Sequence, residues 1–169
     1  MSASSEGNDW LGNVGRRLSS GGFKVFRDIS HEGRTFKMVA HRSRVELTKF
    51  GNCETFFVFS EFDTLSREAM RQFSAKAFEY AKTARSVWLP CGLFESVYCF
   101  AVAIVEVLDD PTAEWVRNEP PAKHWAAAEI PVVYERSRRR LCFFEKTPLW
   151  GAAYYAGFRK QINTFLAVG

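Results

Sequence analysis

The segment from Val97 to Val107 constrains the fold of this chain most strongly. Nine consecutive uncharged and mostly apolar residues precede its first carboxylate, Glu106. A strand with one face in water would alternate apolar with polar residues, so this run favours a strand that is buried on both faces. Such a strand needs covering layers, and segments with helical periodicity around 66–85 and 148–166 are candidates for at least one of them.

The length of 169 residues fits one domain that buries about two thirds of its unfolded surface. Residues 1–22 begin with a Ser/Gly/Asn-rich stretch and end in a Ser-Ser-Gly-Gly sequence, so we expect a flexible N-terminal segment followed by a single domain over 23–169. Within that segment, four apolar residues have a spacing compatible with a short helix: Trp10, Leu11, Val14 and Leu18.

The strand patterns predict an α+β domain with a mainly antiparallel sheet of about seven strands and two principal helices. Short connections between the first strands favour a meander, in which neighbours are antiparallel. The later pair flanks a basic hairpin tip at 136–140. The expected strands are 23–29, 35–41, 44–50, 55–60, 97–107, 130–135 and 141–145.

Local signals support the two helices. Ser66 is placed to cap the first, and a shorter helix is expected near 111–117. The second begins at Pro148, because proline suits the first helical position, and it contains Gly157, which costs a helix about 1 kcal/mol relative to alanine. A packing or a binding requirement would account for this glycine, and we favour packing.

Charge is distributed unevenly along the chain. The formal net charge is +4, but residues 16–49 carry nine basic and three acidic side chains, whereas acidic side chains dominate 106–119. A surface that is basic at one end attracts phosphates or an acidic partner, and this attraction weakens with salt. Five arginines near two turns are candidates for nucleic-acid or anion binding, with solvated surface arginines as the alternative: Arg42, Arg44, Arg138, Arg139 and Arg140.

No nucleophile elbow, glycine-rich phosphate loop, zinc-protease motif or dinucleotide fingerprint occurs in the chain. An alternative prediction is a metal-dependent hydrolase or nuclease using Glu106, Asp109 and Asp110, because carboxylates at a strand end can bind divalent cations. An acidic residue followed two positions later by lysine, typical of restriction-type nucleases, is absent. The other interpretation is that these acids are solvated.

A second group of residues between 120 and 165 is a candidate ligand pocket. If the ends of neighbouring elements meet there, one imidazole and several aromatic rings line a cleft; the alternative is that the tryptophans only close the end of the sheet. The residues of this candidate pocket are His124, Trp125, Glu129, Trp150 and Tyr154. A thiolate–imidazole pair of Cys91 with His124 is also chemically feasible.

The four cysteines include no Cys-x-x-Cys pair, which favours reduced thiols in a reducing compartment. The N-terminus lacks a signal-peptide pattern and no apolar run is long enough for a membrane helix, so we expect a cytoplasmic location and no membrane. The favoured function is a small non-catalytic intracellular binding or adaptor protein without a cofactor. Its expected partner is an acidic protein or nucleic acid, and homo-oligomers are feasible.

Overall fold

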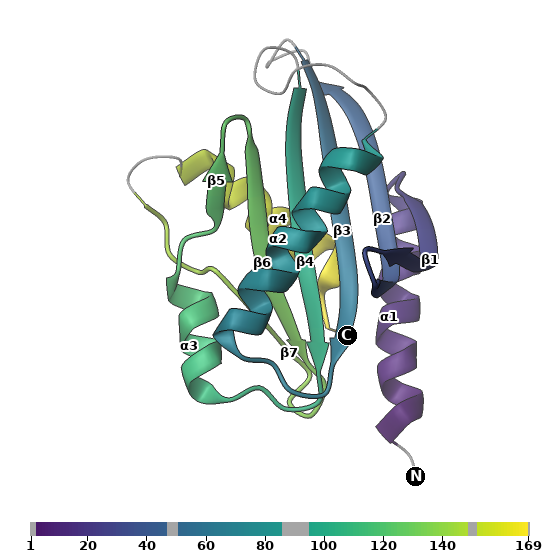
Figure 1. Cartoon of the computed structure of the whole chain (residues 1–169), viewed down its shortest axis with the longest axis vertical. Coiled ribbons are helices and arrows are strands. Elements are labelled where there is room, and N and C mark those ends of the chain that lie inside the picture. Colours follow the sequence, from purple (N-terminus) through teal and green to yellow (C-terminus); the bar gives the residue numbers. More distant parts are fainter. Residues whose placement is uncertain (1–2, 47–50, 86–94, 149–151, 169) are drawn as a thin grey trace.

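The computed structural model describes residues 3–46, 51–85, 95–148 and 152–168. These residues form an α+β fold around one sheet (Figure 1). Their elements are α1 (Ala3–Ser20), β1 (Lys24–His31), β2 (Arg34–Glu46), β3 (Gly51–Phe62), α2 (Arg67–Ala84), β4 (Glu95–Val105), α3 (Asp110–Asn118), β5 (Ala122–His124), β6 (Ala127–Glu135), β7 (Arg140–Phe143) and α4 (Ala152–Leu166).

Strand β4 lies inside the sheet, as the apolar run beginning at Val97 predicts. The hydrogen-bonded order is β1-β2-β3-β4-β6-β5, and β7 also pairs with β6. Every residue of β4 from Val97 to Val105 is buried. Helices cover both faces of the sheet, so positions 97 to 105 offer a polar side chain no access to water.

The sheet is mixed, so the prediction of a mainly antiparallel sheet is wrong. Strands β1, β2 and β3 form an antiparallel meander, but β3 pairs parallel with β4 and β4 pairs parallel with β6. Helix α2 connects the first of these parallel pairs and α3 lies in the connection of the second. Each helical crossover returns the chain to the edge where the previous strand began, and the next strand is therefore parallel.

The part of the chain that the structure describes forms a seven-stranded sheet, which confirms the predicted count, although the strands are divided differently. The expected strands 35–41 and 44–50 are one continuous strand, β2, as far as Glu46, and residues 47–50 lie outside the described part. Continuous pairing from Met38↔Phe59 to Glu46↔Gly51 keeps β2 extended through its polar residues. The seventh strand is the short β5, whose three residues are all exposed.

Two hydrophobic cores lie on opposite faces of the sheet. Because side chains alternate along a strand, Phe57 and Phe100 face the core under α1 and α4, whereas Phe56 and Cys99 face the core under α2 and α3. The Phe57 and Phe100 rings stack with centroids 4.4 Å apart. Burial of each such ring stabilises the fold by about 2 to 3 kcal/mol relative to exposure. The phenylalanine side chains of the sheet therefore contribute a large share of the hydrophobic stabilisation.

The structure contains four helices in its described residues rather than two principal ones. Residues 3–20, which the sequence assigned to a flexible segment, form α1, and the expected short helix near 111–117 is present as α3. The four apolar residues of α1 are buried in the core under α1 and α4: Trp10, Leu11, Val14 and Leu18. The indole of Trp10 stacks on the ring of Tyr134, with ring centroids 3.8 Å apart, and donates a hydrogen bond to the carbonyl of Leu166. These contacts tie the N-terminal helix to the domain.

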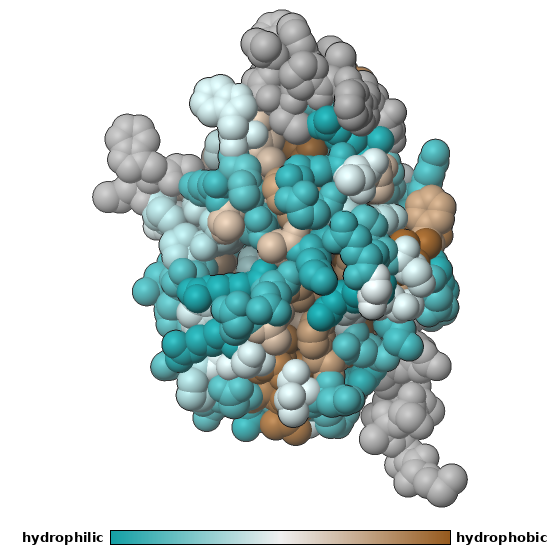
Figure 2. All heavy atoms as spheres, in the orientation of Figure 1, coloured by the Kyte–Doolittle hydropathy of each residue, from teal (hydrophilic) through white to brown (hydrophobic). Residues whose placement is uncertain are grey.

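Hydrophilic side chains cover most of the face that carries α2, with hydrophobic atoms visible between them (Figure 2). Among the described residues, no helix combines the length and the apolar character needed to cross a membrane.

Candidate functional site

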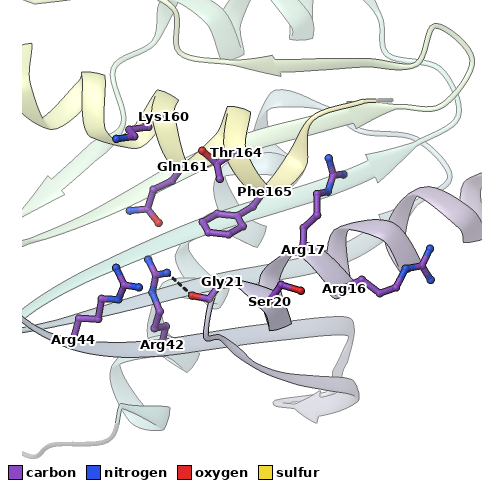
Figure 3. Close-up of a pocket in the computed structure, with 10 residues that line it drawn as sticks. All are labelled: Arg16, Arg17, Ser20, Gly21, Arg42, Arg44, Lys160, Gln161, Thr164 and Phe165. Atoms are coloured by element: carbon purple, nitrogen blue, oxygen red, sulfur yellow. Dashed lines mark hydrogen bonds between the residues drawn. The ribbon is translucent and has the colours of Figure 1, made fainter.

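A basic cleft lies where α1, β2 and α4 approach one another, and it has a volume of about 640 Å³ (Figure 3). Its cations come from three separate parts of the chain: Arg16, Arg17, Arg42, Arg44 and Lys160. Gln161 and Phe165 of α4 also line it. No acidic residue is among the described residues that form its wall. The fold therefore concentrates positive charge that the sequence places more than a hundred residues apart.

The described partners of Arg42 in the basic cleft are a backbone carbonyl and aromatic rings, and no described carboxylate is among them. Its guanidinium donates a hydrogen bond of 2.7 Å to the carbonyl of Gly21 and lies over the ring of Phe23, 4.1 Å from the centroid. Burial, and secondarily the neighbouring charge of Arg44, lower the pKa of Arg42 from its usual value. The guanidinium still remains charged at neutral pH, because arginine is effectively always protonated. Its positive charge is fixed in place and is not neutralised by this carbonyl or this ring.

Arg17 has a similar environment on the other side of the basic cleft. It donates a hydrogen bond of 2.7 Å to the carbonyl of Ala167, and burial lowers its pKa. Arg16 bonds to the neutral amide of Asn13, and its side chain points away along α1 in Figure 3. Arg17 and Arg42 are therefore the cations of the cleft that backbone carbonyls hold in place, whereas Arg44 and Lys160 are exposed.

A second cavity, the aromatic pocket, adjoins the basic cleft and has a volume of about 430 Å³. The two cavities share Arg42, Arg44 and Gln161. The aromatic pocket is lined in addition by the rings of Tyr98, Tyr154 and Phe158 and by the small residues Ala153 and Gly157. Its volume lies in the range of small-molecule sites, and apolar walls beside a few polar groups are typical of such sites.

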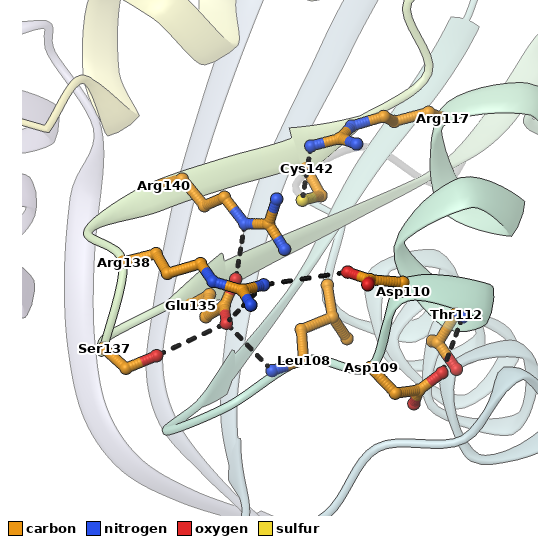
Figure 4. A network of polar contacts seen from close by, with 10 residues as sticks. All are labelled: Leu108, Asp109, Asp110, Thr112, Arg117, Glu135, Ser137, Arg138, Arg140 and Cys142. Atoms are coloured by element: carbon orange, nitrogen blue, oxygen red, sulfur yellow. Dashed lines mark hydrogen bonds and ion pairs between the residues drawn. The ribbon is translucent and has the colours of Figure 1, made fainter.

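The other predicted arginines are in a different environment. In the network around Glu135 (Figure 4), Arg140 donates a hydrogen bond to this buried carboxylate, and Arg138 forms an ion pair with it at 3.5 Å. The third, Arg139, has a positive φ of 45°. A buried carboxylate thus compensates much of the charge at this hairpin tip, in contrast to the basic cleft.

The three carboxylates of the metal-site alternative have separate positions. Asp109 is the N-cap of α3 and accepts a hydrogen bond of 2.8 Å from the backbone N–H of Thr112, which lowers its pKa. Asp110 lies 3.8 Å from Arg138, and Glu106 is an exposed residue just after β4. In the described part of the chain, no three His, Cys, Asp or Glu side chains are grouped as metal ligands would be.

The predicted pocket at His124 is divided between the two faces of the sheet. His124 and Glu129 do meet, with 2.6 Å between Nε2 and Oε1, and His124 stacks on Phe78 of α2. Trp125 is 81% exposed. Tyr154 lines the aromatic pocket under α4, and Trp150 lies outside the described residues. The β5-β6 hairpin brings His124 and Glu129 together. Because side chains alternate between the two faces along β6, Glu129 lies on the face opposite α4.

The described cysteines lie in buried positions: Cys53, Cys99 and Cys142. Burial, with Glu129 nearby, raises the pKa of Cys99, so this thiol is a packing residue rather than a nucleophile. The proposed partner of His124, Cys91, lies outside the described residues.

Comparisons of the chain with protein-family models, with curated proteins and with solved structures gave no match.

Arg42 and Arg44, two of the five arginines predicted from the sequence, line the basic cleft, but the other residues that complete it were not predicted. Arg17 was placed in a flexible segment, and Lys160 and Gln161 were not among the residues singled out in the closing helix. One signal was available: Gly157 was noted as a costly residue inside a helix, and it lines the aromatic pocket. A Cβ atom at this position would meet no atom within 4 Å, so close packing does not require the glycine.

Proposed function

We propose that this protein is a non-catalytic binding or adaptor protein that engages a polyanionic partner through the basic cleft. The observation that carries this proposal is a set of cations on α1, β2 and α4 that have no carboxylate partner among the residues that the structure describes. Arg42 and Arg17 use backbone carbonyls to hold their positions, and the lining of the cleft contains no described acid. Such groups keep their full charge for an incoming ligand.

The type of cation supports the same conclusion. A guanidinium has five N–H donors in a planar arrangement that matches phosphate and carboxylate oxygens. Arg42 uses one guanidinium nitrogen for Gly21, and Arg44 is exposed beside it. The repulsion between Arg42 and Arg44 contributes to the lowered pKa of Arg42. An anion bound between the two guanidiniums would relieve this repulsion. The relief would contribute to the binding free energy of the anion.

A salt series tests this proposal. The double variant Arg42→Gln, Arg44→Gln should bind a labelled single-stranded oligonucleotide at least tenfold more weakly at low salt. The slope of log affinity against log salt should become shallower by about 1.4, or about 0.7 for each phosphate that the variant no longer neutralises. The measurement is fluorescence anisotropy between low and physiological ionic strength, with a poly-glutamate peptide as the second polyanion.

A matched control removes two charges from α2, on the opposite face, through Arg67→Gln and Lys76→Gln. This variant should retain the parental affinity and slope for both probes. Failure of the parent protein to bind either polyanion at low salt, or equal decreases in affinity in the two double variants, would contradict a specific role for the basic cleft.

A further inference from the structure

The aromatic pocket opens beside the cations of the basic cleft, and this adjacency restricts the class of polyanion. Arg42 and Arg44 line both cavities. A ligand whose anionic group lies between these two guanidiniums would have its neighbouring group at the mouth of the aromatic pocket. The structure therefore favours a ligand in which an apolar, planar group follows directly after an anionic one.

The walls of the aromatic pocket suit a planar aromatic ring. Tyr98 and Phe158 are only 8% and 7% exposed and pack edge to face with ring centroids 5.2 Å apart. Tyr154 is 52% exposed and lies at the outer part of the lining. Nucleic-acid bases stack on tyrosine and phenylalanine rings with about 1 to 3 kcal/mol per base, whatever the base is.

Gln161 lines both cavities and offers a hydrogen-bond acceptor to a ligand there. Its Oε1 atom is buried and has no hydrogen-bond partner among the described residues. Figure 3 shows the side chain directed from α4 toward Arg42 and Arg44. A buried acceptor without a donor costs about 1 to 3 kcal/mol. An N–H group of a base or a hydroxyl group of a ribose would supply the missing donor.

Gly157 lines the aromatic pocket and leaves open space beside the helix. A side chain at this position would extend into free space, since an added Cβ meets nothing within 4 Å. Glycine costs an exposed helix interior about 1 kcal/mol, and no neighbouring atom forces this cost by excluding a larger residue. Room for a ligand in the aromatic pocket is a use that fits this position.

We propose that the partner of the basic cleft is a single-stranded nucleic acid, with one base in the aromatic pocket and its adjacent phosphate between Arg42 and Arg44. This proposal rests on the proposed polyanion-binding function and names its ligand. A duplex keeps its bases stacked inside the helix, so it cannot place one beside Tyr98 and Phe158 without unpairing. An acidic peptide would satisfy the arginines but leave the aromatic walls without a planar partner.

The test compares two probes of equal length and charge on the full chain: a labelled oligothymidylate of about twelve nucleotides and an abasic deoxyribose phosphate oligomer. The parent should bind the oligothymidylate at least tenfold more tightly, consistent with stacking of one base. Gly157→Leu, which fills the pocket, should reduce this preference to less than threefold and leave the affinity for the abasic oligomer unchanged.

Ala156→Leu is the matched control, because Ala156 is exposed on the same helix and is not part of the pocket lining. It should keep the parental preference, and thermal unfolding should show that both variants are folded. Equal parental affinity for the two oligomers, a preference unaffected by Gly157→Leu, or tighter binding of poly-glutamate would overturn the base-binding proposal while leaving polyanion binding intact. Absence of binding to every polyanion would instead refute the proposed function.

Discussion

At the scale of single residues, arginine side chains of this molecule occupy two contrasting electrostatic environments. A hydrogen bond to Glu135 raises the pKa of Arg140, whereas burial and the nearby Arg44 lower the pKa of Arg42. The carboxylate of Glu135 also accepts a hydrogen bond of 3.2 Å from the backbone N–H of Leu108. Burial alone would raise the pKa of Glu135, but Arg140, Leu108 and Arg138 outweigh burial and lower it.

Glu135→Gln tests this balance through pH. Because the folded-state pKa of Glu135 lies below its unfolded value, the carboxylate stabilises the fold above about pH 4.3, and this contribution disappears as the pH falls through the folded-state pKa. The variant should be destabilised by about 3 kcal/mol at pH 7, since breaking a buried ion pair leaves a charge unpaired. Urea unfolding of both proteins at pH 7 and below pH 4 should show this difference shrinking in acid. A difference that is constant with pH would contradict the ion-pair explanation.

At the scale of elements, glycines in and near α4 distinguish open from filled space. Phe165 of α4 packs on Phe23 and Phe57, with ring centroids 5.2 and 6.0 Å apart, and lies directly against Gly21 after α1. A Cβ atom at Gly21 would lie 2.5 Å from this ring. The junction of α1 with α4 is thus close-packed, whereas the space beside Gly157 itself is open.

The same substitution at the two glycines should have opposite effects. Gly157→Ala should stabilise the protein by about 1 kcal/mol, because alanine is the better helix former and meets no atom. That gain corresponds to a rise in Tm of about 2 to 4 °C for a domain of this size. Gly21→Ala should destabilise by about 1 to 3 kcal/mol through overpacking against Phe165. Calorimetry measures both values, and destabilisation by Gly157→Ala would show that the space at this position is filled.

At the scale of the whole molecule, one strand connects both cores. β4 hydrogen-bonds to β3 and β6 and is covered on both faces. At the two ends of the sheet, β1 is mostly exposed or half-buried and β5 is fully exposed. Local opening of a protein follows such differences in burial, and the central elements open only when the whole domain unfolds.

Hydrogen exchange should therefore rank the strands from the centre outward. We expect the backbone amides of β4 to exchange with the free energy of global unfolding, and those of β1 and β5 to exchange several orders of magnitude faster. Mass spectrometry with peptide resolution, or NMR, measures this ranking. Comparable exchange in β4 and β1 would contradict the central position of β4.

The mixed sheet shows where sequence reasoning failed. The helix over 66–85 and the shorter one near 111–117 were both predicted, but their effect on strand direction was not applied to the sheet. Strands joined by such helices return in the same direction, so β3, β4 and β6 are parallel. Likewise, the residues of α1 were predicted to be flexible. An amphipathic helix of this kind is stable only when its apolar side packs on a core, and here that core is formed by residues far along the chain.

The sequence by itself determined the buried central strand, the two main helices and the basic character of residues 16–49, because these depend on residues that are neighbours in the chain. Only the tertiary structure decided which arginines are available to a ligand. Arg138 and Arg140 pair with a carboxylate that the fold buries beneath them, whereas Arg42 meets a carbonyl and two rings. The physical reason is that the available charge of a side chain depends on its neighbours in space, and the packing of α1 and α4 on the sheet selects those neighbours.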